Sequence, residues 1–108
     1  MMNDYAEQAK RFKAFCDENR LKIIELLQGG EMCACELIEQ LSMVQSTLSY
    51  HMKILCESGI VINRQEGKWA HYRISAEGSG AAIAYLRQLT TTHGNKETCS
   101  AGCTCGVK

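Results

Sequence analysis

The chain has 108 residues, of which 45% are hydrophobic and 22% charged, and its formal net charge is zero. A chain of this length forms one domain, and domains this small often gain stability by dimerising. No apolar run reaches the ~18–20 residues that a membrane span needs, and the N-terminus lacks the charged and apolar regions of a signal peptide. These features exclude a membrane protein and favour a cytoplasmic one.

Charge is distributed unevenly along the chain. Residues 1–42 carry eight acidic and five basic side chains, and residues 76–108 carry two acidic and three basic ones. The segment 43–75 holds four basic and two acidic side chains, which makes it modestly basic. Such a segment on a neutral chain fits a protein that binds DNA and also leaves it readily.

Cysteine is frequent, with seven residues in the chain. The number is odd and no signal peptide is visible, so a secreted disulfide framework is disfavoured. In a reducing cytosol, clustered thiols more often bind a metal or sense redox state. The cysteines form a close pair, a C-terminal group of three and two isolated residues: Cys33 and Cys35; Cys99, Cys103 and Cys105; Cys16 and Cys56.

Two helices are predicted before residue 31. Apolar residues recur at three- and four-residue steps from Tyr5 to Phe15 or Cys16, which defines one helical face. Cys16 falls on that inner face, where a small core residue suits packing. Asp17 is a suitable N-cap for a second helix, which the glycines at 29–30 end. That second helix is expected to bury Leu21, Ile24 and Leu27.

Residues 31–59 are predicted to form two helices joined by a turn at residues 42–44. The first begins near Cys33 and is expected to bury Leu37, Ile38 and Leu41. The second runs from about Val44 to Ser58, and Gly59 is its C-terminal glycine. Its expected inward residues are Val44, Leu48, His51 or Met52, and Leu55. Small hydroxyl and amide side chains on its first turns are typical of a DNA-reading helix.

A β-hairpin and one further helix complete the predicted domain. A strand begins at residues 60–62, residues 65–68 form a tight turn with the glycine that such turns need, and residues 69–75 return as the second strand. A last helix is predicted from Ala81 to about Thr92. The order α-α-α-α-β-β-α, with a hairpin after a helix-turn-helix, predicts a mainly α (α+β) winged helix-turn-helix fold.

The domain is predicted to span residues 1–95, followed by a flexible Cys-rich tail at 96–108. The first and last helices have apolar faces that a core this small does not fully use. They are the expected interface of a homodimer, because a twofold dimer presents two reading helices to adjacent major grooves of double-stranded operator DNA.

Four segments together resemble the ArsR/SmtB family of metal-responsive bacterial repressors, over roughly residues 5 to 92. They are Glu31 to Leu37, Ser49 to Leu55, Glu57 to Gly59, and Gly67 to Arg73. The Cys-x-Cys in the first of them is similar to the metal box of the family's arsenic and cadmium branches. The resemblance implies a dimeric repressor that leaves its operator when a metal or metalloid binds.

Cys33 and Cys35 are the first predicted metal ligands. Residues i and i+2 lie on different faces of a regular helix, so both thiols can bind one ion only where the chain is still entering the helix. The helix N-terminus is expected to lower the thiol pKa and favour thiolate. Thiolate suits trivalent arsenic and antimony, with cadmium or lead as the alternative. Inorganic and organic arsenicals are not distinguished.

Pyramidal As(III) binds three sulfurs, and the arsenic branch can carry a third cysteine where this chain has Ile38. The candidates for the third ligand are Cys16, Cys56, a tail thiol from either subunit, or a non-protein thiol. Cys99, Cys103 and Cys105 are predicted metal ligands as well, because their spacing lets three sulfurs surround one ion. They could act as a separate capture site or complete the site at Cys33 and Cys35.

The last helix offers only His93 at its end, which argues against a zinc site there. The predicted DNA contacts comprise five residues on the reading helix and three basic residues placed for phosphates. These are Gln45, Ser46, Thr47, Ser49 and Tyr50, and Lys53, Arg64 and Lys68.

The sequence thus predicts a metalloid-responsive repressor, released from DNA by As(III) or Sb(III), with no organic cofactor. Rival hypotheses are a cadmium- or lead-responsive repressor of the same fold, a thiol-redox switch and a cytosolic metal carrier. An enzyme is disfavoured, because no phosphate loop, nucleophile–base pair or acidic pair in a cleft is recognisable.

Overall fold

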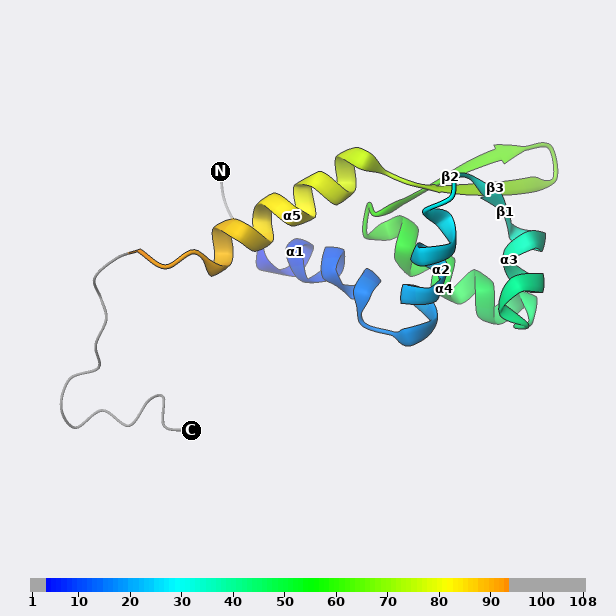
Figure 1. Ribbon diagram of the computed structural model, residues 1–108, viewed down its shortest axis with the longest axis horizontal. Helices are drawn as coiled ribbons and strands as arrows, with labels where there is room; N and C mark the ends of the chain where they lie inside the picture. The colour runs from blue at the N-terminus through cyan, green and yellow to red at the C-terminus, as the bar shows by residue number, and fades with distance from the viewer. Residues whose placement is uncertain (1–3, 94–108) are drawn as a thin grey trace.

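A computed structural model describes residues 4–93 of the chain (Figure 1). Its elements are, in chain order, α1 (Tyr5–Phe12), a short 3-10 turn η1 (Lys13–Phe15), α2 (Glu18–Leu27), β1 (Met32–Cys33), α3 (Ala34–Leu41), α4 (Gln45–Glu57), β2 (Val61–Glu66), β3 (Trp69–Ile74) and α5 (Ala76–Thr90). The predicted winged helix-turn-helix is confirmed, with α3 and α4 as its two helices and the hairpin β2–β3, here called the wing, directly after them. The predicted tail and its three cysteines lie outside the described residues.

The core lies where α2, α3 and α4 meet the base of the wing. Its fully buried side chains are Ile23, Leu37, Leu48, Leu55 and Ile60. The prediction for α2 is wrong by part of a turn: Leu21 is half exposed, whereas Arg20 and Ile23 point inward. Val44 is also exposed, because it precedes α4 as its N-cap instead of lying within the helix.

Local chemistry sets the helix ends. The Asp17 carboxylate accepts hydrogen bonds from the backbone N–H groups of Asn19 and Arg20, which confirms Asp17 as the N-cap of α2. Ser42 ends α3 in the left-handed conformation with φ of 52°, and this reverses the chain direction between the two helices of the helix-turn-helix. Gly59, at φ of 83°, ends α4 as predicted.

The sheet has a third strand that the sequence did not predict. The strand order is β1-β3-β2, and all pairs are antiparallel. In β1, Met32 pairs with Tyr72 and Cys33 pairs with His71. A two-residue strand has no alternating pattern to recognise. The consequence is that Cys33 belongs to the same sheet as the wing.

Helix α5 begins five residues earlier than predicted, at Ala76, with the Ser75 hydroxyl accepting from the Gly78 N–H as its N-cap. Figure 1 shows α1 and α5 side by side, away from the wing. The rings of Phe12 and Tyr85 are in contact at a centroid distance of 6.1 Å. Outward from this contact, α1 and α5 expose the large apolar side chains Tyr5, Ile83, Leu86 and Leu89. Between residues 4 and 93, no helix is long and apolar enough to cross a membrane.

Candidate thiol site and DNA-binding surface

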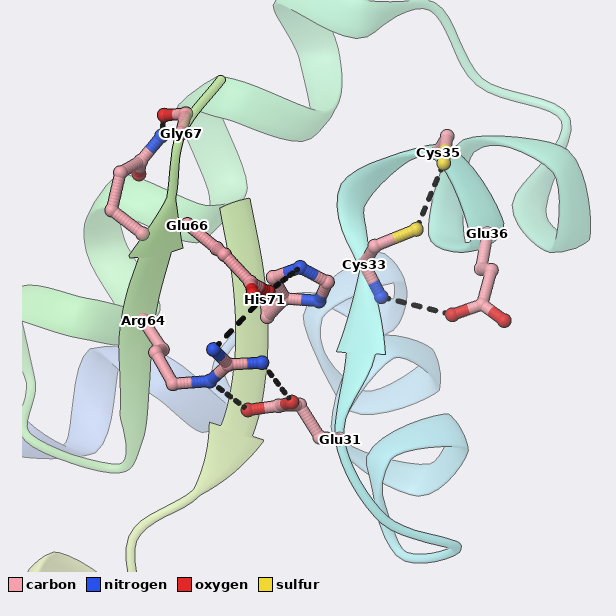
Figure 2. A network of polar contacts seen from close by, with 9 residues as sticks. Glu31, Cys33, Cys35, Glu36, Arg64, Glu66, Gly67 and His71 are labelled. Carbon is pink, nitrogen blue, oxygen red and sulfur yellow. Dashed lines mark hydrogen bonds and ion pairs between the residues drawn. The ribbon is translucent and has the colours of Figure 1, made fainter. Parts of the chain in front are cut away.

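Cys33 and Cys35 lie together where the chain passes from strand to helix. Cys33 is the last residue of β1 and the N-cap of α3, with extended backbone at φ of −85° and ψ of 161°. Cys35 lies in the first turn of α3. Because of this transition the two Sγ atoms are only 2.8 Å apart (Figure 2). The predicted condition, that the chain is still entering the helix at the pair, is therefore met.

The ionisation of Cys35 differs from the expectation. Its pKa is raised above the usual 9.0, first by the hydrogen bond with Cys33 and then by partial desolvation of the thiol. The helix N-terminus was expected to lower the pKa of this thiol, but the two effects that raise the pKa are larger. The hydrogen bond to the neighbouring thiol and the partial loss of water both favour the neutral form of Cys35. Cys35 is therefore a protonated thiol at neutral pH.

The backbone holds the thiol pair in place. The Cys33 N–H donates to the Glu36 carboxylate at 2.9 Å, which satisfies a donor that the helix itself leaves unpaired. Leu37, directly after it, is completely buried and fixes α3 against the core. The thiols are thus positioned by the helix start and not by their own contacts alone.

No third cysteine, histidine or carboxylate joins the pair to form a three-ligand cluster within residues 4–93. Cys16, expected in the core, is exposed because the chain turns at η1, and its thiol donates to the Phe12 carbonyl at 3.3 Å. Cys56 is half-buried in α4, where burial raises its pKa. The pair supplies two sulfurs, and the described part of the chain supplies no third.

A polar network connects the wing to the segment just before the thiol pair, as Figure 2 shows. Glu31, two residues before Cys33, accepts from both Nε and Nη2 of Arg64 on β2, at 3.0 and 2.8 Å. The Arg64 guanidinium lowers the pKa of Glu31 by this hydrogen bonding. Glu66 bridges Arg64 and His71, at 3.3 and 3.5 Å. From the sequence, Arg64 was predicted to contact a DNA phosphate. Its ion pair with Glu31, which is 33 residues away in the chain, was not predicted.

The side chains predicted to contact DNA lie on the outer side of α4 and on the wing. Those on α4 are exposed except for Thr47, which is half-buried, and Lys53 continues the same exposed side. Lys68 lies in the turn of the wing, next to Gly67 at φ of 63°. On the inner side of α4, His51 is buried as predicted. These features define a winged-helix DNA-binding protein.

Comparison with known proteins places this fold in a family. The arsR family of bacterial regulatory proteins matches residues 17–63. An uncharacterised HTH-type transcriptional regulator of Methanocaldococcus jannaschii is 46% identical over 74 residues, which are 68% of this chain and 83% of that protein. The arsenical resistance operon repressor of Staphylococcus xylosus is 34% identical, over 94% of this chain and 90% of the repressor. That of Escherichia coli is 46% identical, but the aligned part is 59% of this chain and 56% of the repressor.

Solved structures agree with this assignment. HlyU from Vibrio cholerae superposes with a TM-score of 0.64 at 32% identity, covering 83% of this chain and 98% of HlyU. An ArsR-family transcriptional regulator has the same fold, with a TM-score of 0.72 at 22% identity, covering 82% and 92% of the two chains. The chain belongs to the ArsR family. It is a DNA-binding transcriptional repressor and not an enzyme.

Proposed function

We propose that the protein represses transcription as a homodimer on twofold-symmetric operator DNA and is released by trivalent arsenic or antimony bound to Cys33 and Cys35. The observation that carries the proposal is the 2.8 Å separation of the two sulfurs at the start of α3. Thiophilic ions prefer such a pair. The arsenical resistance operon repressors among its relatives support the same ligand class.

Release is proposed to act through the sheet. Binding an ion to both sulfurs changes the S···S distance and the entry of the chain into α3, and Cys33 pairs with His71 on the wing. The same binding acts on α4 through the turn at Ser42. A coupling free energy of ~1–3 kcal/mol weakens DNA binding ~5–150-fold.

The DNA contacts are proposed to comprise Gln45, Ser46, Thr47, Ser49, Tyr50, Lys53, Arg64 and Lys68. Dimerisation is proposed to use the exposed apolar side chains of α1 and α5, which lie away from the wing and so leave α4 free. Tail cysteines Cys99, Cys103 and Cys105 are proposed to supply further sulfur ligands. The protein is also proposed to be cytoplasmic, because a bacterial regulatory protein meets its operator DNA in the cytoplasm.

The test is displacement from DNA. Double-stranded DNA selected from random sequence by the apo protein is labelled, and fluorescence anisotropy follows its release by arsenite, cadmium and zinc in parallel. We expect arsenite to release the wild-type protein at the lowest concentration. Cys33→Ser/Cys35→Ser should bind the DNA but no longer respond, whereas the matched thiol control Cys16→Ser should respond as the wild type does. A double variant that still releases at the same arsenite concentration refutes the site.

A thiol-redox switch is the second candidate, and the closeness of the two sulfurs favours it. Oxidation by peroxide would join Cys33 and Cys35 by a disulfide and remove the same two ligands. DNA release by peroxide, reversed by reductant and unaffected by arsenite, would support this function in place of the first.

A further inference from the structure

Val44 is an exposed apolar residue at the start of the DNA-reading helix α4. It is the N-cap of this helix, with extended backbone at φ of −81° and ψ of 160°. Its exposed fraction is 64%, so most of its side chain is left uncovered by the rest of the domain. Gln45, the next residue and a proposed DNA contact, is exposed as well. An apolar and a polar side chain therefore lie next to each other at the beginning of α4.

Valine is unfavourable at this position for the stability of the helix. Serine, threonine, aspartate and asparagine are preferred N-caps, because their side-chain oxygens accept a backbone N–H of the first turn. Asp4, Asp17 and Ser75 accept such hydrogen bonds at the starts of α1, α2 and α5. The side chain of Val44 makes no such bond. A residue that breaks a local rule of stability and stays exposed indicates a role in binding.

Val44 lies beside residues of the DNA-binding surface. Its neighbour Gln45 lines the space between α4 and the wing together with Ser49 and Lys68, and all three are proposed DNA contacts. In helix-turn-helix proteins, the N-terminal residues of the reading helix contact base edges in the major groove. Val44 is thus at the end of α4 that enters the groove.

The major groove offers one kind of partner to an apolar side chain. Its base edges present hydrogen-bond donors and acceptors, and the apolar group among them is the C5-methyl of thymine. Glutamine, in contrast, binds N6 and N7 of adenine. Consecutive Cα atoms are ~3.8 Å apart and consecutive base pairs ~3.4 Å apart, so Val44 and Gln45 match the spacing of neighbouring base pairs.

We propose that Val44 is a specificity-determining residue that contacts the methyl group of a thymine, in the base pair next to the one that Gln45 reads. The inference rests on the proposed DNA contacts and adds a residue to them. The contact buries apolar surface and neutralises no phosphate. It therefore contributes to the sequence preference of the protein and not to the salt dependence of binding.

The test replaces one thymine at a time by uracil, which lacks only the methyl group. DNA selected from random sequence by the full-length wild-type protein is synthesised as a set of duplexes with a single uracil each, and fluorescence anisotropy gives their dissociation constants. We expect a position at which uracil weakens wild-type binding about three- to fivefold, since burial of one methyl group contributes a free energy of that size.

Two variants separate base reading from folding. Val44→Ser removes the methyl groups and supplies a capping hydroxyl, so it should resist urea better than the wild type while binding the thymine duplex more weakly. Val44→Ala removes the apolar contact without adding a hydroxyl and should also bind this duplex more weakly. In both variants uracil should cause no further loss of affinity, because the two changes remove the same contact.

Leu21→Ala is the matched control. It shortens a half-exposed apolar side chain on α2, where no DNA contact is proposed. This variant should keep the wild-type loss of affinity on substitution by uracil. A weaker dependence on the thymine methyl group is then specific to the residue at the start of α4.

The outcomes separate this inference from the proposed function. If uracil weakens wild-type binding at no position, the inference is wrong and the other proposed DNA contacts stand. If the loss caused by uracil persists in Val44→Ser and Val44→Ala, another residue contacts the methyl group and the inference is again wrong. If the wild-type protein selects no DNA sequence, the proposed function fails as well. A loss that disappears in both variants and persists in Leu21→Ala supports the inference.

Discussion

Arg20 on α2 and His51 on α4 are joined by a hydrogen bond of 3.0 Å between Nη1 and Nδ1, and both side chains are buried. Arginine has only donors, so Nδ1 of His51 must accept, and the neutral ring carries its proton on Nε2. Arg20 also donates through Nε to the Lys13 carbonyl at 3.1 Å. The rings of His51 and Tyr50 meet in a T-shaped arrangement, with the centroids 5.1 Å apart. The pair thus fixes α4 to the domain from the side opposite to the proposed DNA contacts.

Loss of His51 should destabilise the protein more than its small size suggests. His51→Ala leaves Nη1 of the buried Arg20 without its acceptor, and the free energy of unfolding is expected to fall by about 3 kcal/mol. His51→Gln keeps an acceptor and should lose less. His71→Ala, on the wing, removes a solvent-screened contact and should lose under ~1 kcal/mol. Urea unfolding measures all three, and equal losses for His51→Ala and His71→Ala would contradict the role of the pair.

Two glycines of α5 should respond oppositely to alanine. A Cβ on Gly78 would collide with the Gly59 carbonyl, whereas a Cβ on Gly80 meets no atom within 4 Å. Gly78→Ala is expected to cost about 1–3 kcal/mol of stability through overpacking. Gly80→Ala should gain about 0.5–1 kcal/mol from higher helix propensity. Thermal unfolding of the two variants tests the close contact between α5 and the end of α4. A higher stability of Gly78→Ala would show that this contact is absent.

The Glu31–Arg64 ion pair should restrain DNA binding. Arg64 has to leave Glu31 before it can contact a phosphate, so Glu31→Gln is expected to tighten DNA binding severalfold. The slope of log affinity against log salt should steepen by about one per added phosphate contact. Glu39→Gln removes an equal charge from an exposed site on α3 and serves as the control. Anisotropy titrations at several salt concentrations compare the DNA affinity of the two variants. If both variants bind DNA equally well, the change in net charge alone explains the tighter binding and the ion pair has no specific role.

The pH dependence of binding should distinguish arsenic from cadmium. The pKa of Cys35 is raised, so its thiol holds a proton at neutral pH. Cd²⁺ must displace that proton, and its affinity should rise with pH by about tenfold per unit for each proton released, up to the thiol pKa. Arsenous acid exchanges hydroxide for thiol and releases water, so its affinity should stay constant from about pH 6 to 8.

Full-length protein and Cys99→Ser/Cys103→Ser/Cys105→Ser are titrated in parallel, so that the tail thiols cannot account for the slope. An arsenite affinity that rises with pH as steeply as that of cadmium would show that thiol–hydroxide exchange is not the binding reaction.

The local parts of the site were predictable from the sequence, because their residues are close in the chain. Cys33 and Cys35 are two residues apart, and the transition from extended chain to helix was enough to bring them together. The inward face of α4 was predictable except for Val44, since Leu48, Met52 and Leu55 follow helical spacing. On α2, apolar residues occupy two faces, and only packing selects Ile23 over Leu21.

The remaining features depend on residues distant in the chain. Strand β1 exists only because β3 lies beside it, and two residues carry no pattern of their own. The Glu31–Arg64 pair joins segments 33 residues apart, and single charged residues give no signal of their partners. The sequence carries no signal that Arg20 is buried, because its acceptor, His51, comes 31 residues later. The start of α5 was hidden by Gly78 and Gly80, which are poor helix formers.

Strand β1, only two residues long and at the edge of the sheet, has a consequence for the dose response. Short edge strands open at low free-energy cost, so a ligand that draws Cys33 out of the sheet has little structure to break. In the proposed mechanism, the inducer concentration at which transcription begins is then set partly by how firmly Met32 and Cys33 pair with β3. Substitutions at Met32 or Tyr72 could adjust this threshold without altering a thiol or a DNA contact.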